Sequence, residues 1–177
     1  MRDRTHGRPT DGEFVEFATV EAGRLRRAAY LMCGDWHMAQ DLTQTALARV
    51  YVAWPRVRSS ASAYAFAQRT LVNAFLAHRR RRSASEIPVS EPVAATTAGA
   101  AEGVAPELRL VLLAALATLP RRARAVVVLR YWEDLSVEQV AAAVGCSPGT
   151  VRSQSARALG KLRHLLGDVE SDLVGTP

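Results

Sequence analysis

Four consecutive arginines, Arg79 to Arg82, are the clearest candidates for chemistry in the chain. Guanidinium groups bind phosphate oxygens in a planar, two-pronged geometry, and they remain charged at physiological pH. A basic run is typical of a nucleic-acid patch, of a nuclear-address-like tract, or of a solvated helix end where cations balance the helix dipole. The surrounding elements must decide among these three.

A second set of candidate residues follows a short turn in the segment VEQVAAAVGCSPGTV. There, small Ala141 lets two helices approach, Gly145 permits a turn with positive φ, and Val151 fills the angle between the helices. The spacing predicts a helix-turn-helix whose second helix presents small and basic residues outward: Arg152, Ser153, Ala156, Arg157, Gly160 and Lys161. Such a helix fits the major groove of DNA, where arginine binds guanine edges. The alternative is a helix hairpin with a solvated basic face.

Charge and composition favour a polyanionic partner without deciding the matter. The chain has 177 residues, 49% of them hydrophobic, and a net charge of +6, which suits a globular protein with a sizeable core. Lys161 is the only lysine among 23 basic residues. A GC-rich genome also produces such arginine-rich chains, so the position of the arginines carries more weight than their number.

Other classes of function are disfavoured by what the sequence lacks. Cys33 and Cys146 lie far apart, with no CxxC pair or histidine cluster beside them, which argues against a disulfide scaffold or a zinc site. The histidines are scattered and no nucleophile motif is present, so we expect no enzyme, no cofactor and no metal. No apolar run is long enough for a signal peptide or a membrane span, which predicts a cytoplasmic protein without membrane contact.

The chain divides into segments of different charge. Residues 1–82 carry 14 basic and seven acidic side chains, whereas residues 83–106 carry three acidic side chains and no basic ones. Residues 83–106 are also rich in Ser, Ala, Thr, Pro and Gly, which predicts a flexible acidic linker. We therefore predict an all-α fold of two small helical domains, residues 12–82 and 107–167, with a flexible tail at 1–11 and an acidic tail at 168–177.

Periodicity and end signals place the helices of the first domain. We expect one helix from a cap at Asp11 to a stop at Gly34, and a second from a cap at Asp35 to Pro55. Residues 55–62 then form a loop. A third helix over 62–82 ends in the four arginines.

Similar signals organise the second domain. Proline suits the first turn of a helix, serine suits the N-cap, and glycine suits the C-terminal stop. Gln139 also stands at capping-box spacing from the serine before it. We expect helices over 106–119, 120–135, 136–144 and 148–166, with end signals at Pro106, Pro120, Ser136, Gly145, Ser147, Pro148 and Gly167.

Over roughly residues 12–82 and 107–166, the chain resembles the bacterial RNA polymerase sigma factors of the extracytoplasmic-function type, group 4 of the sigma-70 family. DLTQTALARVYVAW is similar to that family's Asp-x-x-Gln helix, and LVNAFLAHRRRR to its asparagine followed by arginines. LATLPRRARAVVVLRYWEDLS and the residues after it resemble the family's promoter-reading end, with wording similar to the actinobacterial SigE-like sigma factors. The resemblance implies a protein without catalysis of its own, which lends core RNA polymerase promoter recognition and melting.

The resemblance also implies a role for each group of candidate residues. It places the contact with the clamp helices of the polymerase β′ subunit at Asp41, Gln44 and Arg49. It assigns recognition of the −10 promoter element to Arg56, Arg58, Ser59, Ser60, Asn73, Arg79, Arg80, Arg81 and Arg82, because an extruded base suits a loop and phosphates suit arginines. It assigns reading of the −35 element to Thr150, Arg152, Ser153, Gln154, Arg157 and Lys161. The implied partners are core RNA polymerase, through the β′ clamp helices and the β flap, and promoter DNA; an anti-sigma factor is a further candidate.

Two residues depart from the family pattern. Ala77 stands where the family commonly has aspartate, and Gln154 stands where a basic residue is common. The promoter sequence that this chain prefers therefore cannot be taken from the family. A function from another class also remains open, that of an autonomous helix-turn-helix regulator whose N-terminal domain dimerises or senses a ligand.

The length of the linker sets a geometric condition on the sigma-factor hypothesis. A flexible linker over residues 83–106 would have ends about 27 Å apart on average and about 80 Å apart when fully extended. Two turns of B-DNA span about 70 Å. The linker therefore joins −10 and −35 sites only when stretched, as it would be if polymerase held it.

Overall fold

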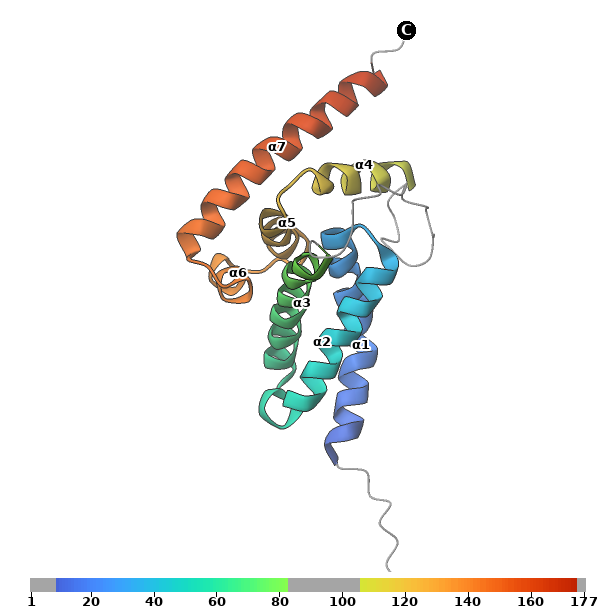
Figure 1. Cartoon of the computed structure of the whole chain (residues 1–177), viewed down its shortest axis with the longest axis vertical. Coiled ribbons are helices and arrows are strands. Elements are labelled where there is room, and N and C mark those ends of the chain that lie inside the picture. Colours follow the sequence, from blue (N-terminus) through green and yellow to red (C-terminus); the bar gives the residue numbers. More distant parts are fainter. Residues whose placement is uncertain (1–8, 83–105, 175–177) are drawn as a thin grey trace, which may run out of the picture.

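The computed structural model describes residues 9–82 and 106–174, and within these ranges every element is helical (Figure 1). This confirms the predicted all-α class for the part of the chain that is described. The elements are α1 (Pro9–Cys33), α2 (Trp36–Val57), α3 (Ser60–Arg82), α4 (Pro106–Ala117), α5 (Arg121–Val127), the π-helical turn η1 (Val128–Trp132), α6 (Val137–Val144) and α7 (Pro148–Val174).

Helices α1, α2 and α3 pack side by side and form what we call the N-terminal domain (Figure 1). Near the α2–α3 turn, one cluster of buried side chains joins all three helices: Phe17, Leu25, Val50, Trp54, Ala63 and Ala67. The Trp54 ring lies 5.3 Å from the Phe17 ring and 5.4 Å from the Phe14 ring, centroid to centroid. Aromatic pairs at this spacing add about 0.5–1.5 kcal/mol each to the stability that burial provides.

The turn between α1 and α2 follows the local signals. Gly34 adopts φ 74° after the end of α1, a backbone conformation that glycine enters without steric cost. The Asp35 carboxylate then accepts the Met38 amide N–H at 2.8 Å and caps α2. Both features were predicted. The start of α1 was not, because the helix already begins at Pro9, before the expected cap at Asp11.

The predicted end of α2 at Pro55 is wrong. The helix runs through the proline to Val57, and α3 begins at Ser60. Burial of the neighbouring Trp54, which is 3% exposed, holds this last turn in place. The loop expected over residues 55–62 is therefore reduced to Arg58 and Ser59.

Helices α4 to α7 form what we call the C-terminal domain, and its middle contains a feature that periodicity does not predict. The single helix expected over residues 120–135 is divided into α5 and the π-helical turn η1. The Glu133 amide N–H bonds the Val128 carbonyl oxygen at 3.1 Å, five residues back, as a widened π turn requires. This turn places Glu133 against the N-terminal domain.

The last helix is longer than expected. Helix α7 passes Gly167, the predicted stop, and continues to Val174. A glycine within a helix costs about 1 kcal/mol relative to alanine, which weakens a helix without ending it. Part of the predicted acidic tail, residues 168–174, therefore belongs to α7. The predicted flexible linker lies outside the described residues, apart from Pro106, which starts α4.

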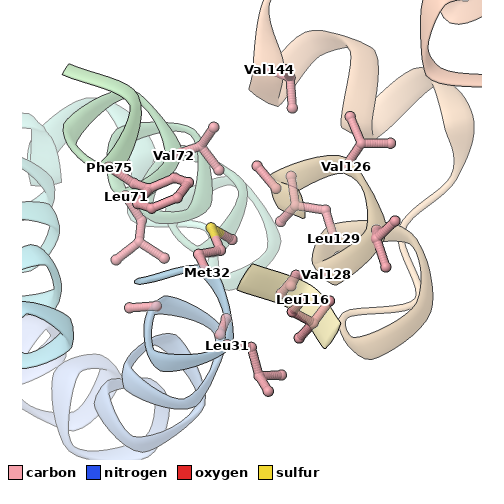
Figure 2. Close-up of a cluster of buried hydrophobic side chains, with 14 of the residues drawn as sticks. Leu31, Met32, Leu71, Val72, Phe75, Leu116, Val126, Val128, Leu129 and Val144 are labelled. Atoms are coloured by element: carbon pink, nitrogen blue, oxygen red, sulfur yellow. The ribbon is translucent and has the colours of Figure 1, made fainter. Parts of the chain in front are cut away.

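The two domains share one hydrophobic core, which the sequence did not predict (Figure 2). Met32 from α1 and Leu71, Val72 and Phe75 from α3 meet residues of the C-terminal domain: Leu116, Val126, Val128, Leu129 and Val144. Complete burial of a side chain such as Leu71 or Phe75 stabilises the fold by about 1.5–3 kcal/mol. The domain boundary is therefore a packed interface in this structure.

Polar contacts reinforce this interface at the end of α1. Arg124 Nη1 donates to the Met32 carbonyl oxygen at 2.9 Å, and Arg121 donates to the Phe75 carbonyl oxygen while its guanidinium lies 4.2 Å above the Phe75 ring. Burial lowers the pKa of Arg124 from its usual value. Burial also raises the pKa of the nearby Cys33 thiol from 9.0 to about 11. Cys33 and Cys146 are both free and half-buried.

Candidate nucleic-acid interface

The helix-turn-helix is built by α6 and α7, and its caps are those predicted. The Ser136 hydroxyl accepts the Gln139 amide N–H at 3.1 Å, while the Gln139 side chain accepts the Ser136 amide N–H at 2.8 Å. Gly145 ends α6 with φ 68°. The Ser147 hydroxyl accepts the Thr150 amide N–H at 3.1 Å, so α7 begins at Pro148 in a fixed orientation. The Gly145 amide N–H also bonds the Ala141 carbonyl oxygen at 2.9 Å, so hydrogen bonds hold the turn between α6 and α7 at both of its ends.

The first turns of α7 present three of the predicted −35 residues to solvent. Arg152, Ser153 and Arg157 are exposed, and buried Val151 anchors the same turns to the core. Arg152 lies 3.5 Å from the Glu138 carboxylate, but both side chains are about two-thirds exposed, so this ion pair contributes less than about 1 kcal/mol. Arg152 can therefore exchange Glu138 for a DNA group at little cost.

Of the other three predicted −35 residues, two make side-chain contacts within the fold and Gln154 is half-buried. Thr150 Oγ1 lies 2.8 Å from the Ser147 hydroxyl in the cap of α7. The Gln154 side-chain oxygen is buried and has no hydrogen-bond partner among the described residues. Lys161 Nζ donates to the Thr118 carbonyl oxygen at 2.9 Å and ties the middle of α7 to the end of α4. The roles of Thr150, Gln154 and Lys161 in reading the −35 element stay predictions.

A pocket of about 650 Å³ lies beside the α2–α3 turn, where the sequence placed the −10 residues. Its lining combines carboxylates, an indole and the turn itself: Glu13, Glu16, Phe17, Val20, Glu21, Trp54, Arg58 and Ser59. The buried Trp54 Nε1 has no hydrogen-bond partner among the described residues. Sequence reasoning found Arg58 and Ser59 but missed the α1 face of this pocket, because the two walls lie about 40 residues apart in the chain.

The remaining −10 candidates are spread along α2 and α3. Arg56 is exposed in the last turn of α2, and Asn73 is exposed in the middle of α3. About 14 residues of α3 separate Asn73 from the pocket, or about 21 Å of helix. Ser60 and Arg79 to Arg82 belong to α3, the arginines in its last turn as predicted, but their side chains lie outside the described residues.

The predicted polymerase-binding residues share the solvent side of α2. Asp41, Gln44 and Arg49 are all exposed, while Leu42 and Val50 point into the core.

Within the described residues, no group of three or more His, Cys, Asp or Glu side chains could hold a metal ion. The same part of the chain contains no helix long and apolar enough to cross a membrane.

The most important residue missed by sequence reasoning is Glu133, at the end of η1. Its carboxylate is 1% exposed and lies 3.0 Å from the Arg24 Nε of the other domain. The Tyr64 hydroxyl and the Gln68 amide also donate to this carboxylate, at 2.6 and 3.0 Å. A glutamate followed by aspartate after a helix gives no local signal of burial, so only the tertiary structure reveals this site.

Two family models match separate parts of the chain. Residues 19–85 match the family model of sigma-70 region 2, and residues 109–162 match that of sigma-70 region 4. The chain is 38% identical over 154 residues to the RNA polymerase sigma-E factor of Streptomyces coelicolor, covering 87% of this chain and 86% of that one. It is 29% identical over 141 residues to the extracytoplasmic-function (ECF) RNA polymerase sigma-E factor of Escherichia coli K12, covering 73% and 72%.

A solved structure shares the arrangement of helices. The sigma factor RpoE of Bartonella quintana, in a complex with the anti-sigma factor NepR, superposes with a TM-score of 0.74 at 25% sequence identity. The match covers 87% of this chain and 96% of that one. Both sigma-70 regions are matched, the relatives align over most of the chain, and α6 and α7 form the expected helix-turn-helix. The chain therefore belongs to the sigma-70 family, as an RNA polymerase sigma factor of the extracytoplasmic-function type.

Proposed function

We propose that this sigma factor reads the −35 element with Arg152, Ser153 and Arg157 of α7, and holds the melted −10 element at the α2–α3 turn and along α3. A sigma factor binds core RNA polymerase and directs initiation at specific promoters. The observation that carries this assignment is the exposed, basic start of α7 on a rigidly capped helix. Arginine in the major groove binds guanine O6 and N7, and a serine hydroxyl binds a phosphate or a base edge.

The pocket beside the α2–α3 turn is suited to a single unstacked base. Its volume of about 650 Å³ accommodates a nucleobase, and Trp54 and Phe17, which are 3% and 8% exposed, contribute a small part of its apolar lining. The carboxylates of Glu13, Glu16 and Glu21 repel phosphate, so a base rather than the DNA backbone enters here. Carboxylate oxygens accept hydrogen bonds from the amino groups of adenine, cytosine or guanine, which would give the pocket a preference among bases.

The exposed face of α2 serves as the docking surface for core polymerase in this proposal. Asp41, Gln44 and Arg49 bear one negative charge, one amide and one positive charge on the same side of the helix. This mixed polarity suits the β′ clamp helices, and the β flap would contact the C-terminal domain. An anti-sigma factor is a further candidate partner, because the structurally similar Bartonella quintana protein was solved with one. The protein would act in the cytoplasm, beside the polymerase.

Run-off transcription on a promoter library tests the proposal. Core polymerase with this protein should yield transcripts from a subset of promoters that share a −35 and a −10 element, and core polymerase alone should not. Tight binding of the isolated chain to a palindromic operator, without any promoter-dependent transcript, would support the autonomous regulator instead. The sigma-70 family membership favours the first outcome.

A further inference from the structure

The carboxylate of Glu133 joins the two domains through one ion pair and two hydrogen bonds. Glu133 belongs to the C-terminal domain, whereas Arg24 lies on α1 and Tyr64 and Gln68 lie on α3. Oε2 of Glu133 receives all three contacts, and Oε1 has no partner among the described residues. The carboxylate therefore depends on the N-terminal domain for every hydrogen bond that the structure describes for its side chain.

Because the Glu133 carboxylate is buried, its contacts determine whether the two domains can stay together. A buried carboxylate is costly unless it is paired and hydrogen-bonded, and removing its partners leaves an uncompensated charge. Glu133 is 3% exposed, so the closed interface tolerates the charge only while Arg24, Tyr64 and Gln68 remain in place. Burial, followed by the hydrogen bond and the negative charge of Glu133, raises the pKa of Tyr64 above its usual value, so this hydroxyl remains a donor at neutral pH.

The contacts around Glu133 belong to a broader closed interface. Figure 2 shows side chains from α1 and α3 facing those of α4, α5, η1 and α6 in one cluster. Arg121 and Arg124 add hydrogen bonds to the Phe75 and Met32 carbonyl oxygens beside this cluster. Apolar packing supplies most of the attraction, and the carboxylate, with its directional bonds, specifies how the two domains meet.

In the closed structure the two proposed DNA surfaces are too close together to occupy both promoter elements. Helix α6 packs against α3, which carries Asn73, and a turn of three residues joins α6 to the start of α7. Eight residues of α6 span about 12 Å. The −10 and −35 elements lie about two turns of B-DNA apart, or about 70 Å. Both surfaces can reach a promoter together only after α6 separates from α3.

We propose that Glu133 is a latch that keeps the two DNA-reading domains of the free chain closed, and that it must release Arg24, Tyr64 and Gln68 before the sigma factor engages a promoter. That Glu133 holds the domains together rests on these contacts. The inhibitory consequence rests on the proposed function of α7 and α3. In this view core polymerase binds the open form, and part of its binding energy is used to separate Glu133 from its partners.

Small-angle X-ray scattering of the full chain tests the latch directly. Glu133→Gln keeps the shape of the side chain but removes the charge that pairs with Arg24. Its matched control is Asp134→Asn, because Asp134 is the next residue, is exposed, and adopts φ 51°, which asparagine tolerates. The Glu133→Gln protein should have a larger radius of gyration than wild type, and the Asp134→Asn protein should match wild type.

Tyr64→Phe is a second variant, used in case the Glu133→Gln protein does not fold. It removes one hydroxyl from the other side of the interface and should expand the chain in the same direction, to a smaller extent. Circular dichroism at 222 nm establishes that helix content is retained; if Glu133→Gln loses helix content, Tyr64→Phe decides the matter. Two results would overturn the proposal. One is a wild-type radius of gyration for Glu133→Gln and Tyr64→Phe proteins that keep their helix content; the other is an extended wild-type chain.

Binding to core polymerase provides the functional readout. If only the open form binds, apparent affinity rises by the inverse of the open fraction, so Glu133→Gln should bind core polymerase roughly tenfold more tightly or better, with Asp134→Asn unchanged. Unchanged affinity for Glu133→Gln would contradict the inhibitory role. If wild-type protein with core polymerase yields no promoter-dependent transcript, the proposed function fails, while the scattering result still decides whether the latch exists.

Discussion

Arg124 Nη1 on α5 lies 2.9 Å from the carbonyl oxygen of Met32 at the end of α1, so a side chain of the C-terminal domain bonds the backbone of the N-terminal domain. The other terminal nitrogen of Arg124 donates to the Ala117 and Leu119 carbonyl oxygens at 2.8 and 3.1 Å. One guanidinium thus satisfies acceptors from α1, from the end of α4 and from the turn after it. Lysine has a single terminal nitrogen and cannot reproduce this fork.

Arg124→Lys should therefore lower the free energy of unfolding by about 1–3 kcal/mol, because partly buried carbonyl oxygens lose their donors. Urea denaturation followed by circular dichroism measures the change. Arg163→Lys is the matched control, since Arg163 is exposed on α7. Equal stability of the two variants would contradict the bridging role of Arg124.

Arg152→Ala should change which −35 sequence is preferred. If Arg152 binds a guanine through two hydrogen bonds, its loss costs about 1–3 kcal/mol at that base pair and little elsewhere. Run-off transcription on a library randomised across the −35 element measures the preference, with Arg163→Ala as the control for loss of positive charge. A uniform decrease over all sequences would instead assign Arg152 to a phosphate.

Paired replacement of Arg80 and Arg81 by alanine should weaken promoter complexes to a similar degree for every sequence. Each phosphate contact that is lost should also reduce the slope of log affinity against log salt concentration by about one. Titrations of promoter complexes at several salt concentrations provide this slope. A slope equal to that of wild type would show that these arginines do not contact the DNA backbone.

Filling the pocket beside the α2–α3 turn should impair the −10 element selectively. Val20 is 70% exposed and lines the pocket, so Val20→Trp places a large ring in the space proposed for an unstacked base. We expect reduced promoter melting, measured with permanganate footprinting, and an unchanged −35 preference. Val15→Trp is the control, because Val15 is 60% exposed on the same helix outside the pocket lining. Normal melting with Val20→Trp would exclude base capture in this pocket.

The stability of the protein should fall in alkaline solution because of Cys33. Burial raises the pKa of this thiol from 9.0 to about 11. The folded state therefore favours the neutral thiol, and its contribution is complete below about pH 9 and lost as the pH rises toward about 11. The loss amounts to at most about 2–3 kcal/mol. Urea midpoints at about pH 8 and about pH 10.5 should differ less for Cys33→Ala than for wild type; an equal difference would contradict this origin.

Local signals predicted the helix boundaries where a side chain or a glycine acts on its own backbone. Asp35, Ser136 and Ser147 cap helices as expected, and Gly145 adopts the positive φ that its position required. The predictions at Pro55 and Gly167 were wrong, because each residue weakens a helix by an amount that packing or neighbouring turns can overcome.

Long-range features lay beyond sequence reasoning. Glu133 meets Gln68 and Tyr64 across 65 and 69 residues, and the π turn that positions it has no sequence signature in a run of valines. Helical periodicity placed Lys161 on the outer face of α7, but the flexible side chain reaches the Thr118 carbonyl oxygen. The predicted roles of Asp41, Gln44 and Arg49 remain predictions, supported by exposure alone.

The hydrogen bond between Lys161 and Thr118 also divides α7 into two arms. Lys161 is the midpoint of Pro148–Val174, so two arms of equal length, each about 20 Å, extend from it. The arm that begins at Pro148 contains the buried Val151 and Ala158 and carries the exposed Arg152 and Arg157. The arm beyond Lys161 carries none of the predicted −35 residues, so the contact with α4 marks the end of the proposed reading surface.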